Sequence, residues 1–567
     1  MDDYTRANRD AVAQLTAIGA PFEVETRYYE GVPLKAYKNA EPNLAQLMAP
    51  GRQFGDATFV QYPGQSLTYN AFWLAVDRLT ATLITELGIV SGDRVAIAMR
   101  NRPEWLIAFT AIIHAGAVVV PLNSWGKSEE LSQSLNDSDA TLLICDSPRY
   151  RYVRQSNSGI TTLLVDACED DNPEHHWKDV LVNDHALPSV QIDSHDPAIL
   201  LFTSGTSGRP KGALFSHFNC CQSLMNIEFI GACTYMTNTD AMNAILSSAT
   251  PPKTLLSVPL FHISGLFSQF IINLRHGRGL YIMYKWDASE ALRLLREEGI
   301  TVIMGAPAML LEMLSIKDFR PEDAKTLSNI SAGGAATPEI LHNLYREKVT
   351  QGLAGAGWGM TETGGTGAAF TGKYMHERPG ASGFPSPILE LSFHDEQGKI
   401  VPEGQPGEIW IRSAAAIQRY ISGASDDADF SDGWLKTGDV GYVSSEGLLY
   451  LSGRTKDMII RGGENIYPAE IESCLLTYPG CIEAAVIGMD SAKWGEEVAA
   501  VMRCELPAAS GDADDVRAHC EHHLAGFKVP AQIIFTDEAF PRNAVQKLLK
   551  SAIRDRYFIT PSQNTEA

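Results

Sequence analysis

The segment that most constrains the fold is an apolar run that passes directly into a Gly-rich turn. Residues 198–202 (AILLF) are apolar, the next residues are Thr, Ser and Gly, and Lys211 follows the turn. Glycines let backbone N–H groups approach a phosphate closely, hydroxyls add donors and Lys supplies positive charge. The pattern predicts a strand that ends in a phosphate-binding loop, although a short Gly/Ser stretch taken alone is also typical of a flexible surface loop.

The spacing within this loop excludes a Walker A motif. That motif needs Gly, four residues and then Gly-Lys-Ser/Thr. Here Gly205 is followed by Thr, Ser, Gly, Arg and Pro before Lys211. A nucleotide-binding loop of another type therefore has to be considered.

Strands and helices are expected to alternate over most of the chain, which indicates parallel sheets covered by helices. A first unit is predicted to contain a helix from Leu67 to near Gly88, a helix at 103–114, and strands at 93–98, 117–121 and 140–145. A second unit is predicted to start with the strand at 198–202 and to contain strands at 255–258, 279–283, 301–304 and 329–332 and a helix at 288–298.

Four other segments differ in character. Residues 147–195 are polar and are interpreted as a surface connection between the two units, and 232–253 as an irregular insertion. Short alternating segments around Gly-Pro turns in 385–450 predict a small antiparallel barrel or sheet. After Arg454 the pattern changes to a compact α+β segment of about a hundred residues, an ordinary size for a small domain.

Charge and composition exclude several classes of function. The net charge of -22 disfavours nucleic acid as a partner, because a phosphate backbone would be repelled. The polar start lacks the apolar core of a secretory signal, and the longest apolar stretch, 105–122, is too interrupted for a transmembrane segment. The nine Cys form no CxxC pair, which favours reduced thiols and a cytoplasmic location.

Six further motifs follow the opening loop. They are PLFHISG at 259–265, SAGGAA at 331–336, GWGMTET at 357–363, GWLKTGD at 433–439, SGRTKDMIIRGGENIYP at 452–468, and PRN at 541–543 with Lys547 four residues beyond. In this order and at these separations they closely resemble the core motifs of the adenylate-forming superfamily. That family includes acyl- and aryl-CoA synthetases, adenylation domains of nonribosomal peptide synthetases, and firefly luciferase. The resemblance extends from about Leu67 to about Lys550.

The resemblance implies an α/β fold with two domains. The large N-terminal AMP-binding domain, residues 1–455, would consist of two doubly wound α/β subdomains plus a small β-barrel. Residues 456–567 would form a small, mobile α+β lid domain. The implied reaction is activation of a carboxylic acid with ATP and Mg²⁺ to an acyl-adenylate, followed by transfer to coenzyme A. Both steps require charge to be neutralised on phosphates and developing oxyanions.

The resemblance also assigns roles to matching residues. The β- and γ-phosphates of ATP would be held by Thr203, Ser204, Gly205, Thr206, Ser207, Gly208 and Lys211. The adenine pocket would be formed by Gly333, Gly334, Ala335, Trp358, Gly359 and Met360, with Trp358 stacking where the family usually has Tyr. The catalytic group would comprise Lys547, Thr361, Glu362 and His262.

Within this group, Thr361 would contact the α-phosphate and Glu362 would bind Mg²⁺, for which carboxylate and phosphate oxygens are suitable ligands. Asp439 would bind the ribose hydroxyls with help from Arg454. Lys547 would bridge the carboxylate and the α-phosphate during adenylation.

The family works by rotating its small domain, and this chain carries the matching residues. Lys456 stands at the hinge position, where a polar exposed residue suits a backbone that changes φ and ψ. After rotation, Arg461, Gly462 and Gly463 would line the pantetheine tunnel. One departure is Gln546, where the family usually has Gly before the catalytic Lys, so entry of that loop into the active site is expected to be restricted.

Two positions bear on the acid. His262 replaces the Asp with which amino-acid-activating members pair the substrate ammonium, so an α-amino acid is disfavoured. Gly359 replaces the Trp with which acetate- and propionate-activating members close the acyl pocket. A larger apolar acid (fatty, aryl or polycyclic) is therefore predicted, in a pocket walled by residues 226–235, 304–309 and 333–335.

Several alternatives stay open from the sequence. An acyl-AMP ligase that loads a carrier-protein thiol is one, although the extra insertion of the fatty acyl-AMP ligases has no clear equivalent here. A non-catalytic homologue is another, opposed by the presence of Glu362, Asp439, Arg454 and Lys547. Light emission of the luciferase kind would need a special substrate. Motifs do not decide whether the protein forms a homodimer.

Overall fold

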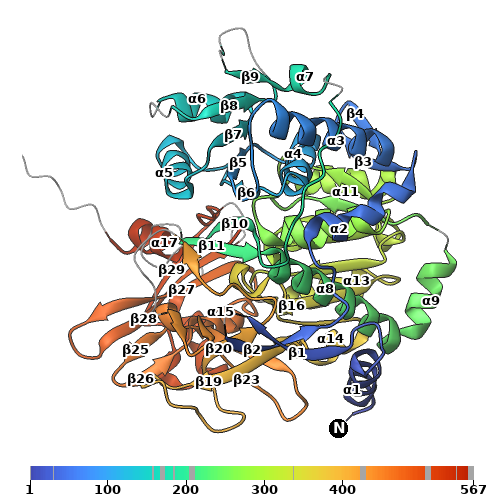
Figure 1. Cartoon of the computed structure of the whole chain (residues 1–567). Helices are drawn as coiled ribbons and strands as arrows, with labels where there is room; N and C mark the ends of the chain where they lie inside the picture. Colours follow the sequence, from blue (N-terminus) through green and yellow to red (C-terminus); the bar gives the residue numbers. More distant parts are fainter. Residues whose placement is uncertain are drawn as a thin grey trace, which may run out of the picture.

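The three-dimensional structure is a computed structural model of the whole chain (Figure 1). The residues it describes are 2–29, 31–155, 159–166, 171, 173–182, 185–203, 211–248, 250–335, 337–421, 429–504, 512–543 and 546–559. Across these ranges, no helix combines the length and apolar character needed to cross a bilayer.

An eight-stranded sheet forms the first subdomain. Its order is β21 (Tyr420–Ile421), β11 (Lys211–Ser216), β10 (Pro197–Thr203), β6 (Val118–Pro121), β5 (Arg94–Ala98), β7 (Leu142–Cys145), β8 (Thr161–Leu164) and β9 (His175–His176). The strands from β10 to β9 are parallel, whereas β11 pairs antiparallel with both β10 and β21. Since parallel strands need covering on both faces, most of their side chains are buried.

A second sheet begins with a parallel part and continues into an antiparallel part. The parallel part contains β3 (Thr58–Tyr62), β13 (Gly279–Ile282), β12 (Lys253–Leu256), β14 (Val302–Gly305), β15 (Asn329–Ala332) and β16 (Leu353–Trp358), with β4 (Gln65–Thr68) antiparallel at its edge. The antiparallel part contains β17 (Ala368–Thr371), β18 (Ala381–Pro385), β24 (Leu449–Arg454), β23 (Trp434–Val443), β22 (Phe430–Ser431), β20 (Gly407–Ser413) and β19 (Leu389–His394).

The structure corrects the predicted division between the two units. The strand at 198–202 does not open the second sheet, because β10 pairs with β6 of the first. The segment 147–195 is more than a surface connection, since β8 and β9 extend the first sheet. Conversely, β3 and β4 come early in the chain but pair in the second sheet. The segment 385–450 is antiparallel as predicted, and its strands continue from β17 through β18.

Helices cover both sheets (Figure 1). In the large domain they are α1 (Asp3–Thr16), α2 (Leu44–Met48), α3 (Tyr69–Thr85), α4 (Pro103–His114), α5 (Ser128–Ser138), α6 (Ser147–Gln155), α7 (Trp177–Val180), α8 (His217–Thr237), α9 (Thr239–Ser247), α10 (Ile272–Arg275), α11 (Ala288–Glu298), α12 (Pro307–Leu314), α13 (Glu339–Lys348) and α14 (Lys373–Glu377). The helices predicted at 103–114 and 288–298 have the expected bounds.

Two helical predictions need correction. The helix expected from Leu67 starts at Tyr69, because the Thr68 hydroxyl accepts the Ala71 N–H and caps the helix there. The segment 232–253 is not irregular, since α8 continues to Thr237 and α9 follows at once.

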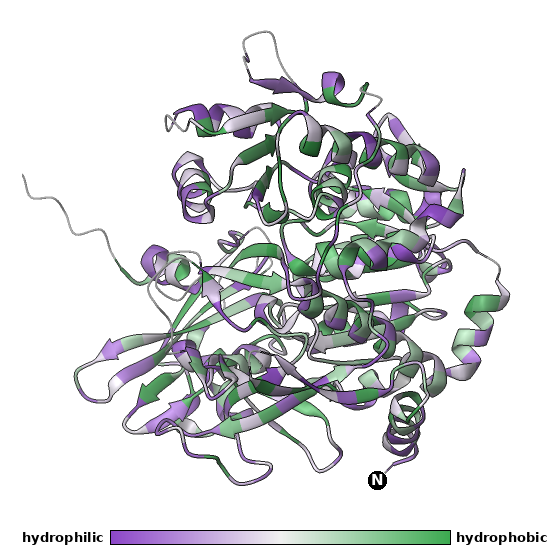
Figure 2. Ribbon diagram, viewed as in Figure 1, coloured by the Kyte–Doolittle hydropathy of each residue, from purple (hydrophilic) through white to green (hydrophobic). Residues whose placement is uncertain are grey.

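A five-stranded sheet forms the C-terminal part of the chain. It consists of β26 (Glu464–Ile466), β25 (Ile459–Arg461), β28 (Gly495–Cys504), β27 (Cys481–Ser491) and β29 (Gln532–Thr536), with α15 (Pro468–Leu475), α16 (Ala513–His523) and α17 (Lys550–Tyr557). It has its own apolar core, as expected for a small α+β domain. Figure 2 shows the apolar residues on the inner strands, with polar residues on outer helices such as α5 and α6.

Buried histidines should make the fold sensitive to acid. Burial lowers the pKa of His114, His217 and His342 to about 4 and that of His262 to about 3. The unfolded chain then binds more protons than the folded chain, so stability is complete above about pH 6.5 and decreases as the pH falls toward 4. Each such histidine contributes up to about 1.4 kcal/mol per pH unit in that window.

We therefore expect a lower thermal midpoint at pH 5 than at pH 7.5, measured at one fixed scan rate. His114 packs edge-on against Trp73, and its Nε2 has no hydrogen-bond partner among the described residues. His114→Leu should reduce the difference between the two midpoints. An unchanged difference in this variant would contradict the explanation.

Candidate active site

The predicted site residues come from strand ends and turns of several elements. Thr203 ends β10 and Lys211 starts β11, so these two residues stand on either side of residues 204–210. Ser204, Gly205, Thr206, Ser207 and Gly208, predicted to hold phosphates, lie outside the described residues. Trp358 ends β16 and Arg454 ends β24, while Asp439 lies within β23 opposite Arg454. Ligand sites at the carboxyl ends of strands are typical of open α/β sheets.

Glu362 is a buried carboxylate in a short turn after β16. Glu362 is only 6% exposed, and its Oε1 accepts a hydrogen bond from the Tyr420 hydroxyl at 2.9 Å. Burial raises the pKa of Glu362, while hydrogen bonds from its own backbone, Tyr420 and Thr203 oppose this effect. A desolvated carboxylate at this position is well suited to meet a cation.

Asp439 is held on both carboxylate oxygens. The Trp358 indole N–H donates to Oδ2 at 2.8 Å, and Arg454 Nε lies 2.9 Å from Oδ1. Trp358 is almost fully buried, and a Cβ placed on Gly367 would lie only 3.0 Å from its ring. The predicted stacking of Trp358 on adenine stays a prediction, and the structure adds that the indole edge orients Asp439.

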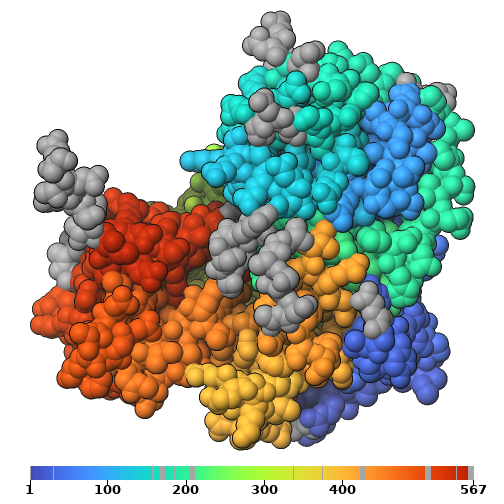
Figure 3. Space-filling view, turned by 60° about the vertical axis from the view of Figure 1, so that its left-hand side comes forward, coloured from blue at the N-terminus to red at the C-terminus, as the bar shows by residue number. Residues whose placement is uncertain are grey.

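Lys547 reaches from the C-terminal segment into this group. A Cβ placed on Gly334 would lie 3.6 Å from Lys547 Cε. Burial and the neighbouring Arg454 lower the pKa of Lys547, whereas Asp439 and Glu362 oppose the shift. The structure thus brings Lys547 together with Gly334, Asp439 and Glu362, and the C-terminal part of the chain packs against the large domain (Figure 3).

His262 lies near Lys547 at the start of a π-helical segment, Ser264–Ile271. Burial first and the positive charge of Lys547 second lower the pKa of His262 to about 3, so its imidazole is neutral at pH 7. Its Nε2 is buried and has no hydrogen-bond partner among the described residues. Short π-helical segments often occur at functional sites, and a neutral imidazole cannot pair with an anion by charge.

Lys211 and Tyr420 connect the opening loop with Glu362. Lys211 Nζ pairs with Asp429 at 2.6 Å and lies 5.2 Å from the centroid of the Tyr420 ring. Tyr420 is on β21, which pairs with β11 and so places its hydroxyl at Glu362. No motif in the sequence pointed to Tyr420, because its place follows from a pairing between strands far apart in the chain.

Arg461, Gly462 and Gly463 lie apart from this group, in the hairpin between β25 and β26. Arg461 donates to the Phe527 carbonyl at 2.9 Å, and the Gly462 N–H donates to the Trp494 carbonyl at 2.8 Å. Both glycines have positive φ, 62° and 90°, which explains their use in this turn. Lys456 is exposed in the connection between β24 and β25.

A magnesium ion would have to share its ligands with the nucleotide. Among the described residues, no cluster of three or more His, Cys, Asp or Glu side chains could hold a metal ion. Magnesium is commonly bound by one or two carboxylates together with substrate phosphates. The buried carboxylate of Glu362 fits that arrangement.

Gly359 has a packing reason to be glycine. A Cβ at this position would collide with the carbonyl oxygen of Gly365. The next residues, Met360 and Thr361, enter the turn that carries Glu362. This contact concerns the backbone of the turn. That Gly359 leaves the acyl pocket open therefore stays a prediction.

The hydroxyl of Tyr420 offers a first test of the site. Tyr420→Phe removes one donor from Glu362, so the pKa of the carboxyl should rise further and its cation binding weaken. We expect the rate of pyrophosphate release to fall about threefold to tenfold and the required Mg²⁺ concentration to rise. Tyr442→Phe, at a tyrosine of β23 that stacks on Tyr450, is the control. Equal Mg²⁺ curves for both variants would argue against this role.

Gln546 offers a second test. Its φ is 63°, a left-handed conformation that costs an L-residue about 1–2 kcal/mol. The loop is held there because Gln546 N–H donates to Asn543 O and Arg542 donates to Gln546 O. Gln546→Gly should relieve this strain and speed adenylation about fivefold. Gln546→Ala keeps the Cβ and should bring no gain, and an equal gain from both substitutions would refute the strain explanation.

Comparison with known proteins identifies the family of this chain. The model of the family of AMP-binding enzymes matches residues 48–421, and that of the AMP-binding enzyme C-terminal domain matches residues 470–547. The chain is 32% identical to the long-chain-fatty-acid–CoA ligase FadD13 of Mycobacterium tuberculosis, over 85% of this chain and 91% of that protein. It is 33% identical to the feruloyl-CoA synthase of an Amycolatopsis species, over 88% and 96%.

A solved structure shows the same likeness. O-succinylbenzoate coenzyme A synthetase (MenE) from Bacillus subtilis, in complex with ATP and magnesium ion, matches with a TM-score of 0.73 and 27% identity over 91% of this chain and 100% of that one. The chain belongs to the AMP-binding enzyme family, in its acyl-CoA synthetase branch, as the motifs predicted. It is an AMP-forming acid–thiol ligase, whose cofactor set is ATP, Mg²⁺ and coenzyme A.

Proposed function

We propose that this ligase activates a medium-to-large apolar carboxylic acid, such as a fatty, aryl or polycyclic acid, and transfers the acyl group to coenzyme A. The observation that carries the proposal is the neutral imidazole of His262, with its buried Nε2, at the position where an amino-acid-activating enzyme would need an anion. The relatives named for long-chain fatty acids and for feruloyl-CoA support an apolar acid without choosing between aliphatic and aromatic ones.

In the first step, a carboxylate oxygen of the acid attacks the α-phosphorus of ATP. A bond forms between that oxygen and phosphorus, and the bond to the bridging oxygen of the leaving pyrophosphate breaks. Lys547 would bridge the carboxylate and the α-phosphate, Thr361 would donate to that phosphate, and Asp439 with Arg454 would hold the ribose. Mg²⁺ bound to Glu362 would supply charge neutralisation on the phosphates.

In the second step, the thiolate of coenzyme A attacks the acyl carbonyl and AMP leaves. We propose that residues 456–567 rotate about Lys456 and bring Arg461, Gly462 and Gly463 to the site. The exposed position of Lys456 between two sheets supports a hinge there. The arrangement with Lys547 inside corresponds to the adenylation step.

Pyrophosphate release across a panel of acids tests the proposal. Acetate, octanoate, palmitate, ferulate and a sterol-derived acid would each be assayed with and without coenzyme A, with direct detection of the thioester. Activity confined to acetate would refute the apolar-acid assignment. Pyrophosphate release without any thioester to coenzyme A would indicate that a carrier-protein thiol is the acceptor.

A further inference from the structure

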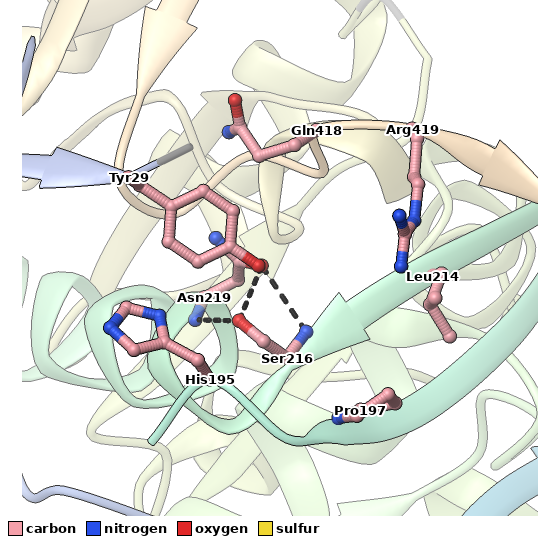
Figure 4. Close-up of a pocket in the computed structure, with 8 residues that line it drawn as sticks. All are labelled: Tyr29, His195, Pro197, Leu214, Ser216, Asn219, Gln418 and Arg419. Carbon is pink, nitrogen blue, oxygen red and sulfur yellow. Dashed lines mark hydrogen bonds between the residues drawn. The ribbon is translucent and has the colours of Figure 1, made fainter. Parts of the chain in front are cut away.

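The family model starts at residue 48, yet the preceding segment is built into the core. The strands β1 (Val24–Tyr29) and β2 (Val32–Tyr37) pair antiparallel as a hairpin, and β2 contacts α8. In Figure 4, Tyr29 of this hairpin lies beside Ser216 and Asn219, whose mutual hydrogen bonds cap α8. Tyr37, the last residue of β2, is completely buried.

Tyr37 is fixed to α8 by its backbone and by its side chain. The Gln222 side-chain amide pairs with both backbone groups of Tyr37, accepting from its N–H at 2.7 Å and donating to its carbonyl at 2.9 Å. The Tyr37 hydroxyl donates to Asn226 Oδ1 at 2.8 Å. Because the Gln222 side chain holds the backbone of Tyr37 in this way, the Tyr37 hydroxyl has little freedom to move.

Asn226 passes this restraint on to the turn that carries Thr361 and Glu362. Its Oδ1 also accepts from the Ser386 hydroxyl at 2.6 Å, and its Nδ2 donates to the Thr366 carbonyl at 2.8 Å. Asn226 is 2% exposed, so these hydrogen bonds of its side chain are sheltered from water. Buried polar networks of this kind fix the geometry of the groups that they join.

The turn also rests directly on α8. A Cβ at Gly364 would collide with the Ser223 hydroxyl, and Ser223 in turn donates to the Ala415 carbonyl at 3.1 Å. Close to this point, the Ile417 N–H donates to the Glu362 carbonyl at 3.0 Å. These contacts tie the turn that carries Glu362 to α8 and to residues 415–417.

We infer that Tyr37 is a positioning residue for adenylation: through Asn226 it holds the turn that carries Thr361 and Glu362. The inference rests on the proposed ligase reaction. Displacing a catalytic group by about 1 Å can cost large factors in rate. Loss of the Tyr37 hydroxyl should therefore have a measurable effect on the rate of adenylation. Tyr37 acts on the first step, because Thr361 and Glu362 are proposed to meet the phosphates of ATP.

The test compares Tyr37→Phe with Tyr28→Phe in the full-length protein. Tyr28 lies on the same hairpin but is 74% exposed, so the same chemical change there is a matched control. For Tyr37→Phe we expect adenylation to fall about tenfold and thioester formation from supplied acyl-adenylate to stay within about twofold of the unsubstituted protein. Ser386→Ala, which removes the other donor to Asn226 Oδ1, should give the same pattern.

Hydrogen exchange gives a readout besides activity. The N–H groups of Gly364, Gly365 and Gly367 are bonded within the turn, to the carbonyls of Thr361, Met360 and Trp358. Their exchange should accelerate in Tyr37→Phe and not in Tyr28→Phe. An equal loss of both half-reactions would mean a merely structural role, and no loss would mean no coupling; either overturns the inference. If the unsubstituted protein adenylates no acid, the proposed function fails, while the exchange rates still decide the coupling.

Discussion

Lys547→Ala should abolish adenylation while sparing the second half-reaction. The lysine lies among Gly334, Asp439 and Glu362, where its charge would bridge the two reacting groups. Losing such a group costs about a hundredfold or more in rate. Pyrophosphate release should fall by that factor, and thioester formation from supplied acyl-adenylate and coenzyme A should stay near the original rate.

Lys550→Ala is the matched control for this experiment. Lys550 is three residues further on in the same segment but pairs with Glu472 of the C-terminal domain. It should leave both half-reactions unchanged. Equal loss of the two half-reactions in Lys547→Ala would show that the lysine has been given the wrong role.

Glu362→Gln should reduce adenylation about a hundredfold or more, because the amide cannot neutralise a cation and the cation would lose its protein ligand. The same substitution should not destabilise the fold. Burial raises the pKa of Glu362, which means that the folded protein disfavours its charged form, and a neutral amide of equal shape avoids that cost. We expect a thermal midpoint equal to or above that of the unsubstituted protein at pH 7.5.

Titration with Mg²⁺ separates this result from a general loss of activity. Glu362→Gln should need a much higher Mg²⁺ concentration for half-maximal adenylation. Glu339→Gln, at an exposed position in the first turn of α13, is the control and should follow the original curve. Identical curves for both variants would exclude Glu362 as the metal ligand.

The motifs predicted the family and the order of the strands more successfully than the sheet to which each strand belongs. Alternating helices and strands report on local periodicity, whereas the pairing of β10 with β6 or of β3 with β13 is a contact between distant segments. The missed helical segment has a different cause. It comprises the end of α8 and all of α9, where Cys233 alone is buried among the described residues 232–248, so no apolar face packed on a core marks it as a helix.

The candidate site shows the same limit at the level of single residues. Asp439, Arg454 and Lys547 could be named from spacing, and the structure brings them together. The Trp358 indole bond to Asp439 and the Tyr420 bond to Glu362 were not predictable, because each depends on two strands that meet only in the folded protein. The strain at Gln546 could be suspected only from the expected Gly and required its φ to be seen.

The exchange of strands between the two sheets has a consequence for biosynthesis. The first sheet contains residues 94–98 but is completed at its edge by residues 420–421, and the second contains residues 58–68 but needs β13 as their partner. Neither sheet can therefore acquire all of its strands while the ribosome is still producing the middle of the chain. Since long-range pairing slows folding and leaves strand edges exposed, the nascent polypeptide should depend on chaperones until β24, which ends at residue 454, has emerged. Fragments of the chain that contain only some of the strands of each sheet should be insoluble.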